Sequence, residues 1–257
     1  FESYTGYHFI ALINFNIFTI IANLMIVYFL ILNSIIVIME NKITLSPSNL
    51  TFLWHSCKRC FYNHHVHKNR RPMIMPLVGK MATLSEEWFL DKETQDIDTS
   101  LPLGKIISTQ KSLKTPIETN EELFRSYSIS GKTDLLIEFS DGTFGIFDCK
   151  NSAGDSDKSW MYYTQLAAYK YCFEKMGLGE VSQLGLIYQI IDGFYKDEKG
   201  ANHFTTEQKF VEVDPNMDQF IKLLSNVIQC LESEIAPNSS PKCSYCKFAE
   251  KYNETLS

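Results

Sequence analysis

The sequence predicts an α/β fold in which a small mixed β-sheet is flanked by helices. Two runs rich in Ile, Leu, Phe and Thr flank Ser140-Asp141-Gly142, which is the pattern of a β-hairpin with a three-residue loop. A continuous apolar run over residues 184–191 is typical of a strand buried on both faces. Between them, residues 160–176 carry apolar side chains at the helical period, so this helix should cover one face of the sheet.

Composition allows an ordinary globular protein. The chain has 257 residues, 45% hydrophobic and 21% charged, enough for one full core and about one or two domains. The net charge of -6 provides no global basic field, so any nucleic-acid contact must come from local patches. We expect an apolar segment over residues 1–39 and a folded domain over residues 40–257.

The apolar segment has two interpretations. No charged residue occurs from Ile10 to Met39, a run longer than the roughly 20 residues that cross a hydrocarbon core. The Lys and Arg residues that follow would keep the domain cytoplasmic, anchored to the membrane. Alternatively, Met39 begins MENKITLSPSNL, which looks like a natural start, and residues 1–38 are then upstream sequence translated by mistake. The chain is then simply cytoplasmic.

The remaining elements follow from local signals. Ser46 before Pro47 predicts a helix start, and Asp214 before Pro215 predicts the cap of the last helix. We expect, in order, a helix ending near Trp88, a polar loop-rich insertion over 91–120, an exposed turn region over 194–204, an edge strand over 209–213 and a final helix over 214–234.

The hairpin brings charged side chains together. Its loop pairs Phe139 with Thr143, and counting back along both strands places Asp134 opposite Asp148, with Cβ atoms roughly 5 Å apart. Because side chains alternate along a strand, Asp148 and Lys150 point to one face, about 6.6 Å apart along the chain. Two carboxylates and an ammonium group therefore converge.

Two carboxylates this close repel each other unless a cation neutralises them. A hard Mg²⁺ or Mn²⁺ ion suits oxygen ligands. Such an ion lowers the pKa of a bound water and stabilises charge on a phosphate, while a neighbouring lysine orients the nucleophile. The set therefore indicates a site for phosphodiester hydrolysis. The plainer interpretation is a strand-edge acid, Asp134, beside a solvated pair, Asp148 and Lys150.

The motifs together resemble a known family. Gly131-Lys132-Thr133-Asp134, Asp148-Cys149-Lys150, and Gln165 with Tyr169 four residues later resemble the G-x-x-D, D-x-K and Q-x-x-x-Y motifs of the PD-(D/E)XK nuclease superfamily, in its RecB-like exonuclease branch. The resemblance implies a restriction-endonuclease-like core with its motifs within residues 128–192. It extends to the SPSNLTFLWHSCKRCFYN stretch, which is similar to the opening of RecB-like domains.

The resemblance implies roles for the motif residues. Asp134, Asp148 and the backbone carbonyl of Cys149 would be metal ligands, and Lys150 the catalytic lysine. Gln165 and Tyr169 would be further catalytic residues, which share a helix face and reach back over the active-site strands toward metal-bound water or the DNA backbone. A buried hydrogen-bonded pair is the alternative.

RecB-like domains also place a histidine or glutamate from an early helix at the metal. The predicted helix before Leu90 has no histidine, so Glu86 or Glu87 would supply this ligand, and Glu87 is the residue that we assign. An exposed helical acid is the alternative.

Four cysteines suggest a second site. Cys57 with Cys60, and Cys243 with Cys246, form two C-x-x-C pairs that could complete one four-thiolate site if the two ends of the domain meet. Similar relatives, including AddB-type and CRISPR-associated exonucleases, hold a 4Fe-4S cluster with one early and three late cysteines. This chain has two and two, which leaves structural Zn²⁺ almost as plausible.

Three histidines follow the first cysteine pair. His64, His65 and His67 could form a local zinc site with Cys57 and Cys60. We favour a basic loop, in which these histidines and the neighbouring Lys68, Arg70 and Arg71 contact phosphate or solvent.

The sequence therefore predicts a Mg²⁺- or Mn²⁺-dependent deoxyribonuclease, an exonuclease of repair or recombination that takes a DNA single strand or duplex end. A helicase or recombination protein is the expected partner. The alternative is a catalytically inactive nucleic-acid-binding or assembly module with the same fold. Trp160 could stack on a base, but we expect it to anchor its helix in the core.

Overall fold

The computed structural model describes residues 24–29, 42–70, 76–119, 122–154 and 158–256. Contacts divide the chain into a unit of residues 1–42 with 124–126, and a larger unit of residues 43–123 with 127–257. The predicted apolar segment lies outside the described residues except for 24–29, which are helical. Within the described parts of the chain, no helix is both long enough and apolar enough to cross a membrane.

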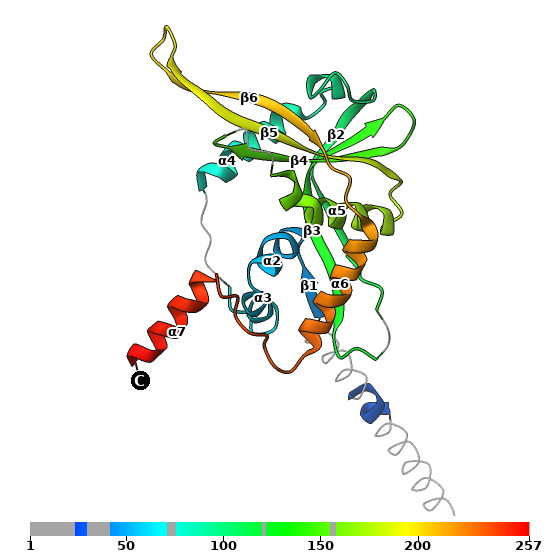
Figure 1. Ribbon diagram of the computed structural model, residues 1–257. Coiled ribbons are helices and arrows are strands. Elements are labelled where there is room, and N and C mark those ends of the chain that lie inside the picture. Colours follow the sequence, from blue (N-terminus) through cyan, green and yellow to red (C-terminus); the bar gives the residue numbers. More distant parts are fainter. Residues whose placement is uncertain (1–23, 30–41, 71–75, 120–121, 155–157, 257) are drawn as a thin grey trace, which may run out of the picture. The chain divides into compact units, whose positions relative to one another are not determined.

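The larger unit is built on a six-stranded mixed sheet (Figure 1). The strands are β1 (Lys42–Leu45), β2 (Gly104–Pro116), β3 (Ser126–Phe139), β4 (Phe144–Ser152), β5 (Val181–Lys196) and β6 (Asn202–Glu212). Their order is β1-β3-β4-β5-β6, and β2 also pairs with β3. β4 and β5 are parallel, whereas β2 with β3, β3 with β4, and β5 with β6 are antiparallel. The α/β class with a small mixed sheet is confirmed.

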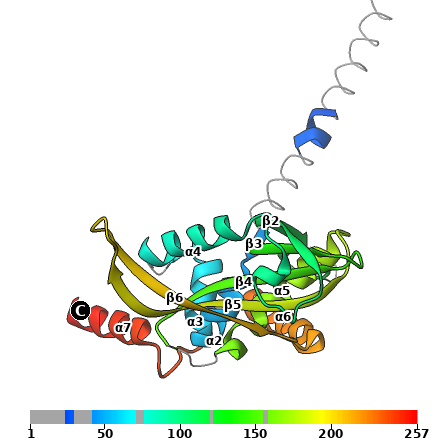
Figure 2. The same ribbon diagram turned by 90° about the horizontal axis from the view of Figure 1, so that it is seen from above.

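Helices cover both faces of this sheet. They are η1 (Asn49–Leu53), α2 (Trp54–Ser56), α3 (Lys58–His65), α4 (Pro76–Phe89), η2 (Thr94–Asp96), η3 (Ser159–Tyr162), α5 (Tyr163–Lys175), α6 (Met217–Glu232) and α7 (Ser244–Leu256). Helix α5 makes the crossover that the parallel pair β4–β5 requires. It contacts β2, β4 and β5, whereas α4 lies along β4 (Figure 2).

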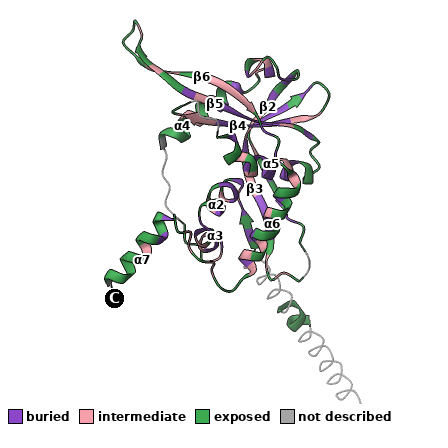
Figure 3. Cartoon of the chain, viewed as in Figure 1, coloured by how far each residue is buried: buried purple, intermediate pink, exposed green. Residues whose placement is uncertain are grey.

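Alternation along the strands places buried residues of the sheet in two clusters. Buried residues lie along the strands and on the helices that pack against them (Figure 3). Leu136 and Ile146 join the large cluster that contains α5 and α6. Their neighbours Leu135 and Phe147 point the other way and pack with Phe89 of α4. Because successive side chains of a strand point to opposite faces, each strand residue can be assigned to one face of the sheet.

Two helix starts test the capping predictions. At the first, the Ser46 hydroxyl accepts a hydrogen bond from the Asn49 N–H (3.1 Å) and Pro47 is the first helical residue, as predicted. For the helix expected over 214–234 the prediction of the cap was wrong, and this helix is not the final one, because α7 follows it. Asn216, not Asp214, caps α6, because its side-chain oxygen lies 3.0 Å from the Gln219 N–H.

Two loop predictions were also wrong. The region 91–120, predicted as a loop-rich insertion, contains the 13-residue strand β2, whose Ile106 and Leu113 are buried. Its intervening polar residues conceal the alternation in the sequence, and pairing with β3 stabilises the strand. The expected turn region 194–204 is mostly strand, because β5 continues to Lys196 and β6 begins at Asn202. The resulting arm projects from the sheet (Figure 1).

Candidate active site and thiol site

The predicted hairpin forms with the predicted register. The Phe139 N–H donates to the Thr143 carbonyl (2.9 Å), and Gly142 closes the loop at φ +85°. This left-handed conformation favours glycine. The ladder runs from Leu135 opposite Phe147 to Glu138 opposite Phe144. The next residues in this register are Asp134 and Asp148.

Strands β3 and β4 separate at this point. β4 continues beside β5, with Asp148 opposite Leu186, while β3 continues beside β2. Asp134 bridges the opening, because its Oδ2 atom accepts a hydrogen bond from the Cys149 N–H (2.8 Å). The carboxylate thus takes the place of a main-chain acceptor for an N–H that would otherwise be unsatisfied.

One face of the sheet carries the charged groups. Asp134 lies two residues before Leu136, and Asp148 and Lys150 lie two and four residues after Ile146, so all three share the face that α5 covers. The Lys150 ammonium forms an ion pair with Asp148. Sequence and structure agree on this placement.

Helix α5 contacts the site through its amide. Gln165 Nε2 donates to Asp148 Oδ1 (3.0 Å) and to the Tyr169 hydroxyl (3.3 Å), and both side chains are buried. The four-residue spacing brings them to one face of the helix. Asp148 is therefore held by a lysine from its own strand and an amide from the covering helix.

Lys150 has a further neighbour that the sequence did not single out. The Tyr162 ring lies with its centroid 4.8 Å from Nζ of Lys150, a cation–π distance. Tyr162 in turn packs edge-on against Phe52, with centroids 5.7 Å apart. Only its position just before the helix that carries Gln165 could have indicated this role.

The structure places Glu86 and Glu87 differently. Glu86 is 5% exposed, and its Oε2 accepts a hydrogen bond from Gln110 Nε2 of β2 (2.6 Å). Glu87, the residue assigned from the sequence, is exposed. The charges of Asp148 and Lys150 act on Glu86. The burial of Glu86, which no sequence pattern shows, distinguishes it from the exposed Glu87.

Electrostatics at the site reflect an excess of acid. Burial and the nearby Asp148 charge raise the pKa of Asp134 to about 8. Burial also raises the pKa of Glu86. Burial alone would lower the pKa of Lys150, but the Asp148 and Asp134 carboxylates outweigh it and raise this pKa.

The chemistry of these residues suits a divalent cation. Among the described residues, the four cysteines of the two C-x-x-C pairs are the group of ligand atoms gathered closely enough to hold an ion, so the carboxylates are candidates by their chemistry and not by their spacing. The carboxyl groups of Asp134, Asp148 and Glu86 all interact electrostatically with the ammonium of Lys150, and Asp148 also forms an ion pair with it. Their oxygen atoms are the hard ligands that Mg²⁺ and Mn²⁺ prefer. A second positive charge at this place would lower the pKa values that burial and repulsion raise.

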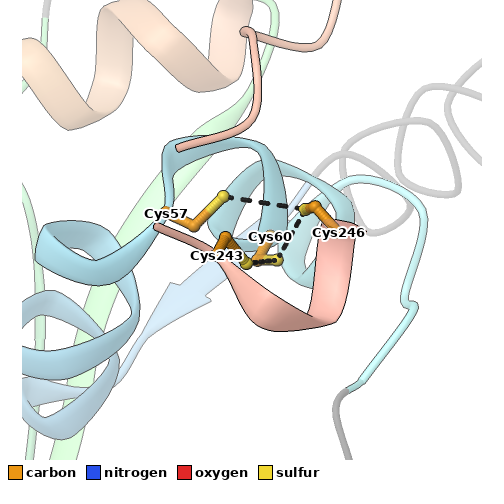
Figure 4. A group of neighbouring side chains, drawn as sticks. All are labelled: Cys57, Cys60, Cys243 and Cys246. Carbon is orange, nitrogen blue, oxygen red and sulfur yellow. Dashed lines mark hydrogen bonds between the residues drawn. The ribbon is translucent and has the colours of Figure 1, made fainter. Parts of the chain in front are cut away.

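The four predicted cysteines meet (Figure 4). Cys57 and Cys60 lie at the start of α3, and Cys243 and Cys246 at the start of α7. All four are buried, and their sulfur atoms lie within 4.8 Å of one another. The sulfur of Cys60 is 3.4 Å from that of Cys246 and 3.7 Å from that of Cys243.

The sulfur set fits a metal centre. Burial alone would raise the pKa of Cys57, but N–H groups of Ser240 and Cys60 outweigh it and lower this pKa to about 7. Burial and the neighbouring thiols raise the pKa of Cys60, and burial raises that of Cys246 to about 11. One thiolate therefore makes ionisation of the neighbouring thiols less favourable, whereas a bound cation would make their ionisation more favourable. The set is compatible with zinc or with an iron-sulfur cluster.

The histidines do not join this group. Among the described residues, the candidate metal group near α3 consists of the four cysteines. His65 is buried against Phe61, with ring centroids 4.5 Å apart. His64 contacts Asn49 (3.1 Å), and His67 is exposed beside Lys68. The alternative of a zinc site with Cys57 and Cys60 is therefore not what the structure assembles.

Comparison with known families identifies the class of protein. The sequence model of the PD-(D/E)XK nuclease superfamily matches residues 77–250, about two thirds of the chain. The chain belongs to this superfamily, and its fold is consistent with the restriction-endonuclease-like core.

Comparisons with individual proteins say less about this chain than the family match does. No curated protein matches the chain significantly. Among solved structures, the crystal structure of SSO0001 is similar, with 17% sequence identity over 80% of this chain and 84% of that chain and a TM-score of 0.48. A likeness at this level does not bear on function.

Proposed function

We propose that this chain is a Mg²⁺- or Mn²⁺-dependent deoxyribonuclease of the RecB-like branch, acting as an exonuclease in DNA repair or recombination. One observation carries the proposal: Asp134, Asp148 and Lys150 share one face of the sheet where β3 and β4 separate. The superfamily match supports hydrolysis of nucleic acid.

Each acidic group has a proposed part. Asp134, Asp148 and the carbonyl of Cys149 would hold the ion, and Glu86, in place of Glu87, would be the carboxylate from the early helix. The bound ion would supply Lewis-acid polarisation of the phosphate and acidification of water. The ion pair with Lys150 and the hydrogen bond from Gln165 keep Asp148 in one rotamer, so its oxygens are oriented in advance.

Lys150 is the proposed catalytic lysine. Its pKa is raised, so it stays protonated at neutral pH and can neutralise charge that develops on a phosphate. The Tyr162 ring restrains it on one side and Asp148 on the other. Tyr169 accepts a hydrogen bond from Gln165, so we assign it the part of a positioning residue.

The direct test is cleavage of labelled single- and double-stranded DNA in Mg²⁺ or Mn²⁺ by the wild type and by Lys150→Ala. We expect the rate to fall by about 10²–10³-fold, as when one electrostatic stabiliser of a transition state is removed. Lys132→Ala is the matched control, because Lys132 is an exposed lysine of the same hairpin. Equal rates in wild type and Lys150→Ala refute the proposal. Binding without cleavage by the wild type would instead identify the inactive binding module.

For the cysteines we propose a structural metal centre. The sulfur separations of 3.4, 3.7 and 3.8 Å match the ~3.8 Å of four sulfurs around one zinc ion at a Zn–S distance of 2.3 Å. A 4Fe-4S cluster binds each thiolate to a different iron, so the sulfurs would have to stand farther apart. Metal analysis and an absorption spectrum of anaerobically purified protein distinguish zinc from iron-sulfur.

A further inference from the structure

Trp160 is not the core anchor that its helical position suggested. Its side chain is 68% exposed, and Met161 and Tyr163 beside it are 36% and 42% exposed. Large aromatic side chains usually bury most of their surface. Here three large side chains at the start of α5 face outward beside Tyr162, while Gln165 and Leu166 of the same helix turn inward.

This exposed group is next in the chain to a ring that contacts the proposed catalytic lysine. Trp160 and Tyr162 belong to the same 3₁₀ turn, η3, in which two residues span about 4 Å along the axis. Tyr162 contacts the Lys150 ammonium. The backbone of Trp160 is therefore about 4 Å along this turn from a residue that touches the proposed site.

A basic segment contacts η3 and the start of α5. Residues 43–70 contain Lys58, Arg59, Lys68 and Arg70, and no Asp or Glu. This segment contacts the start of α5 through Phe52 against Tyr162 and through His55 at 3.5 Å from the Thr164 hydroxyl. The charge of Arg59 is neutralised by Glu250. Lys58, Lys68 and Arg70 are exposed and complementary to a chain of phosphates.

We propose that Trp160 stacks on a base of an unpaired DNA strand whose phosphates follow the basic segment 43–70, which makes single-stranded DNA the preferred substrate. The inference rests on the proposed nuclease function. Bases in a duplex are stacked on one another, whereas an unpaired strand offers a free face to an aromatic ring. Grooves that bind single strands combine such rings with cations along the backbone.

The test is equilibrium binding of labelled oligo(dT) and of a blunt duplex of equal length, with Ca²⁺ in place of Mg²⁺. We expect Trp160→Ala to weaken oligo(dT) binding by about 5–100-fold, the range for loss of one stacked base. Duplex binding should change less than about twofold. Phe248→Ala is the matched control, because Phe248 is also 68% exposed but lies on α7.

Tryptophan fluorescence gives an independent readout. Of the three tryptophans, Trp54 is buried and Trp88 is 55% exposed. Oligo(dT) should quench the wild-type emission through Trp160. Trp160→Phe should keep the affinity within about threefold, because a phenyl ring also stacks, but should lose the quenching.

The outcomes separate this inference from the proposed function. Unchanged oligo(dT) affinity in Trp160→Ala, an equal loss for the duplex, an equal loss in Phe248→Ala, or quenching that persists in Trp160→Phe overturns the stacking role while cleavage stands. A wild-type chain that binds and cleaves neither DNA overturns both. Selective loss of single-strand binding supports the inference.

Discussion

The carboxylate site and the thiol site are assembled from different distances along the chain. Asp134, Asp148 and Lys150 come from one hairpin, and Gln165 follows on the next helix. The cysteine pairs that touch are separated by 183–189 residues. The first site depends on strand register, whereas the second depends on the whole domain closing so that the start of α7 meets the start of α3.

The two sites also differ in how they balance charge. Lys150 provides a positive charge next to the carboxylates through its ion pair with Asp148. Asp134 and Asp148 also both accept hydrogen bonds from the protein. The four sulfurs have no cation of their own within the described group. An ion bound by the carboxylates should therefore mainly support catalysis, whereas an ion bound by the sulfurs should mainly stabilise the fold.

The largest expected effect tests the thiol half of this comparison. Cys60→Ser removes the sulfur that contacts both late cysteines, so the metal centre and its link between α3 and α7 should be lost. An ion at 1,000 times its Kd contributes about 4 kcal/mol, and a comparable loss should appear in thermal unfolding followed by circular dichroism.

The control for this loss is Cys230→Ser. Cys230 is a half-buried free thiol on α6 outside the group, and its substitution should cost less than about 1 kcal/mol. If the Cys60→Ser and Cys230→Ser variants unfold at the same temperature, the four sulfurs do not hold a stabilising ion.

The next effect separates the two glutamates of α4. Glu86→Gln should weaken metal-dependent cleavage by about 10–100-fold, the usual range for a residue that supports a metal site. Glu87→Gln should change the rate less than about twofold, because Glu87 is exposed. Titration of the rate with Mn²⁺ would show the difference as a higher metal requirement. The reverse order would restore Glu87 as the early carboxylate.

The pH dependence probes the raised pKa of Asp134. Because its folded pKa of about 8 lies above its ordinary value of 3.8, the metal-free folded protein binds more protons than the unfolded chain between these values, so its stability falls as pH rises through this window. A divalent ion must displace this proton, so apparent metal affinity should rise up to about tenfold per pH unit and level off above pH 8. Calorimetric titrations at several pH values measure it, and Asp134→Asn should remove the slope.

The smallest effect concerns the loop that sets the register. Gly142 has φ +85°, and a methyl group added to its Cα atom would meet no other atom within 4 Å. Gly142→Ala should therefore cost about 1 kcal/mol from backbone conformation alone. Gly154→Ala is matched, because Gly154 has equal space without a left-handed φ, and should be neutral. Unfolding in urea compares the two. Equal stability would mean that the loop does not constrain the carboxylate site.

Sequence reasoning succeeded where structure is local. Loop length and strand alternation were enough to predict the hairpin ladder from Phe139 opposite Thr143 to Leu135 opposite Phe147, because this follows from the repeat of a strand and the geometry of one turn. The ladder ends one pair before Asp134 and Asp148, so their role as one site stays a prediction. The prediction failed at β2, whose polar alternating residues become a strand only by pairing with β3. Sequence reasoning also predicted that Trp160 would lie in the core, whereas its side chain is 68% exposed.

By itself, the sequence determined the hairpin, the motifs it carries and the superfamily to which they belong, since each of these depends on residues close together in the chain. Tertiary structure alone decided that Glu86 and not Glu87 is buried near the acids, that four distant cysteines meet, and that Trp160 faces outward. These outcomes depend on which surfaces pack together. Packing depends on contacts between segments that are far apart in the chain, and the periodicity of the sequence does not show which of these segments meet.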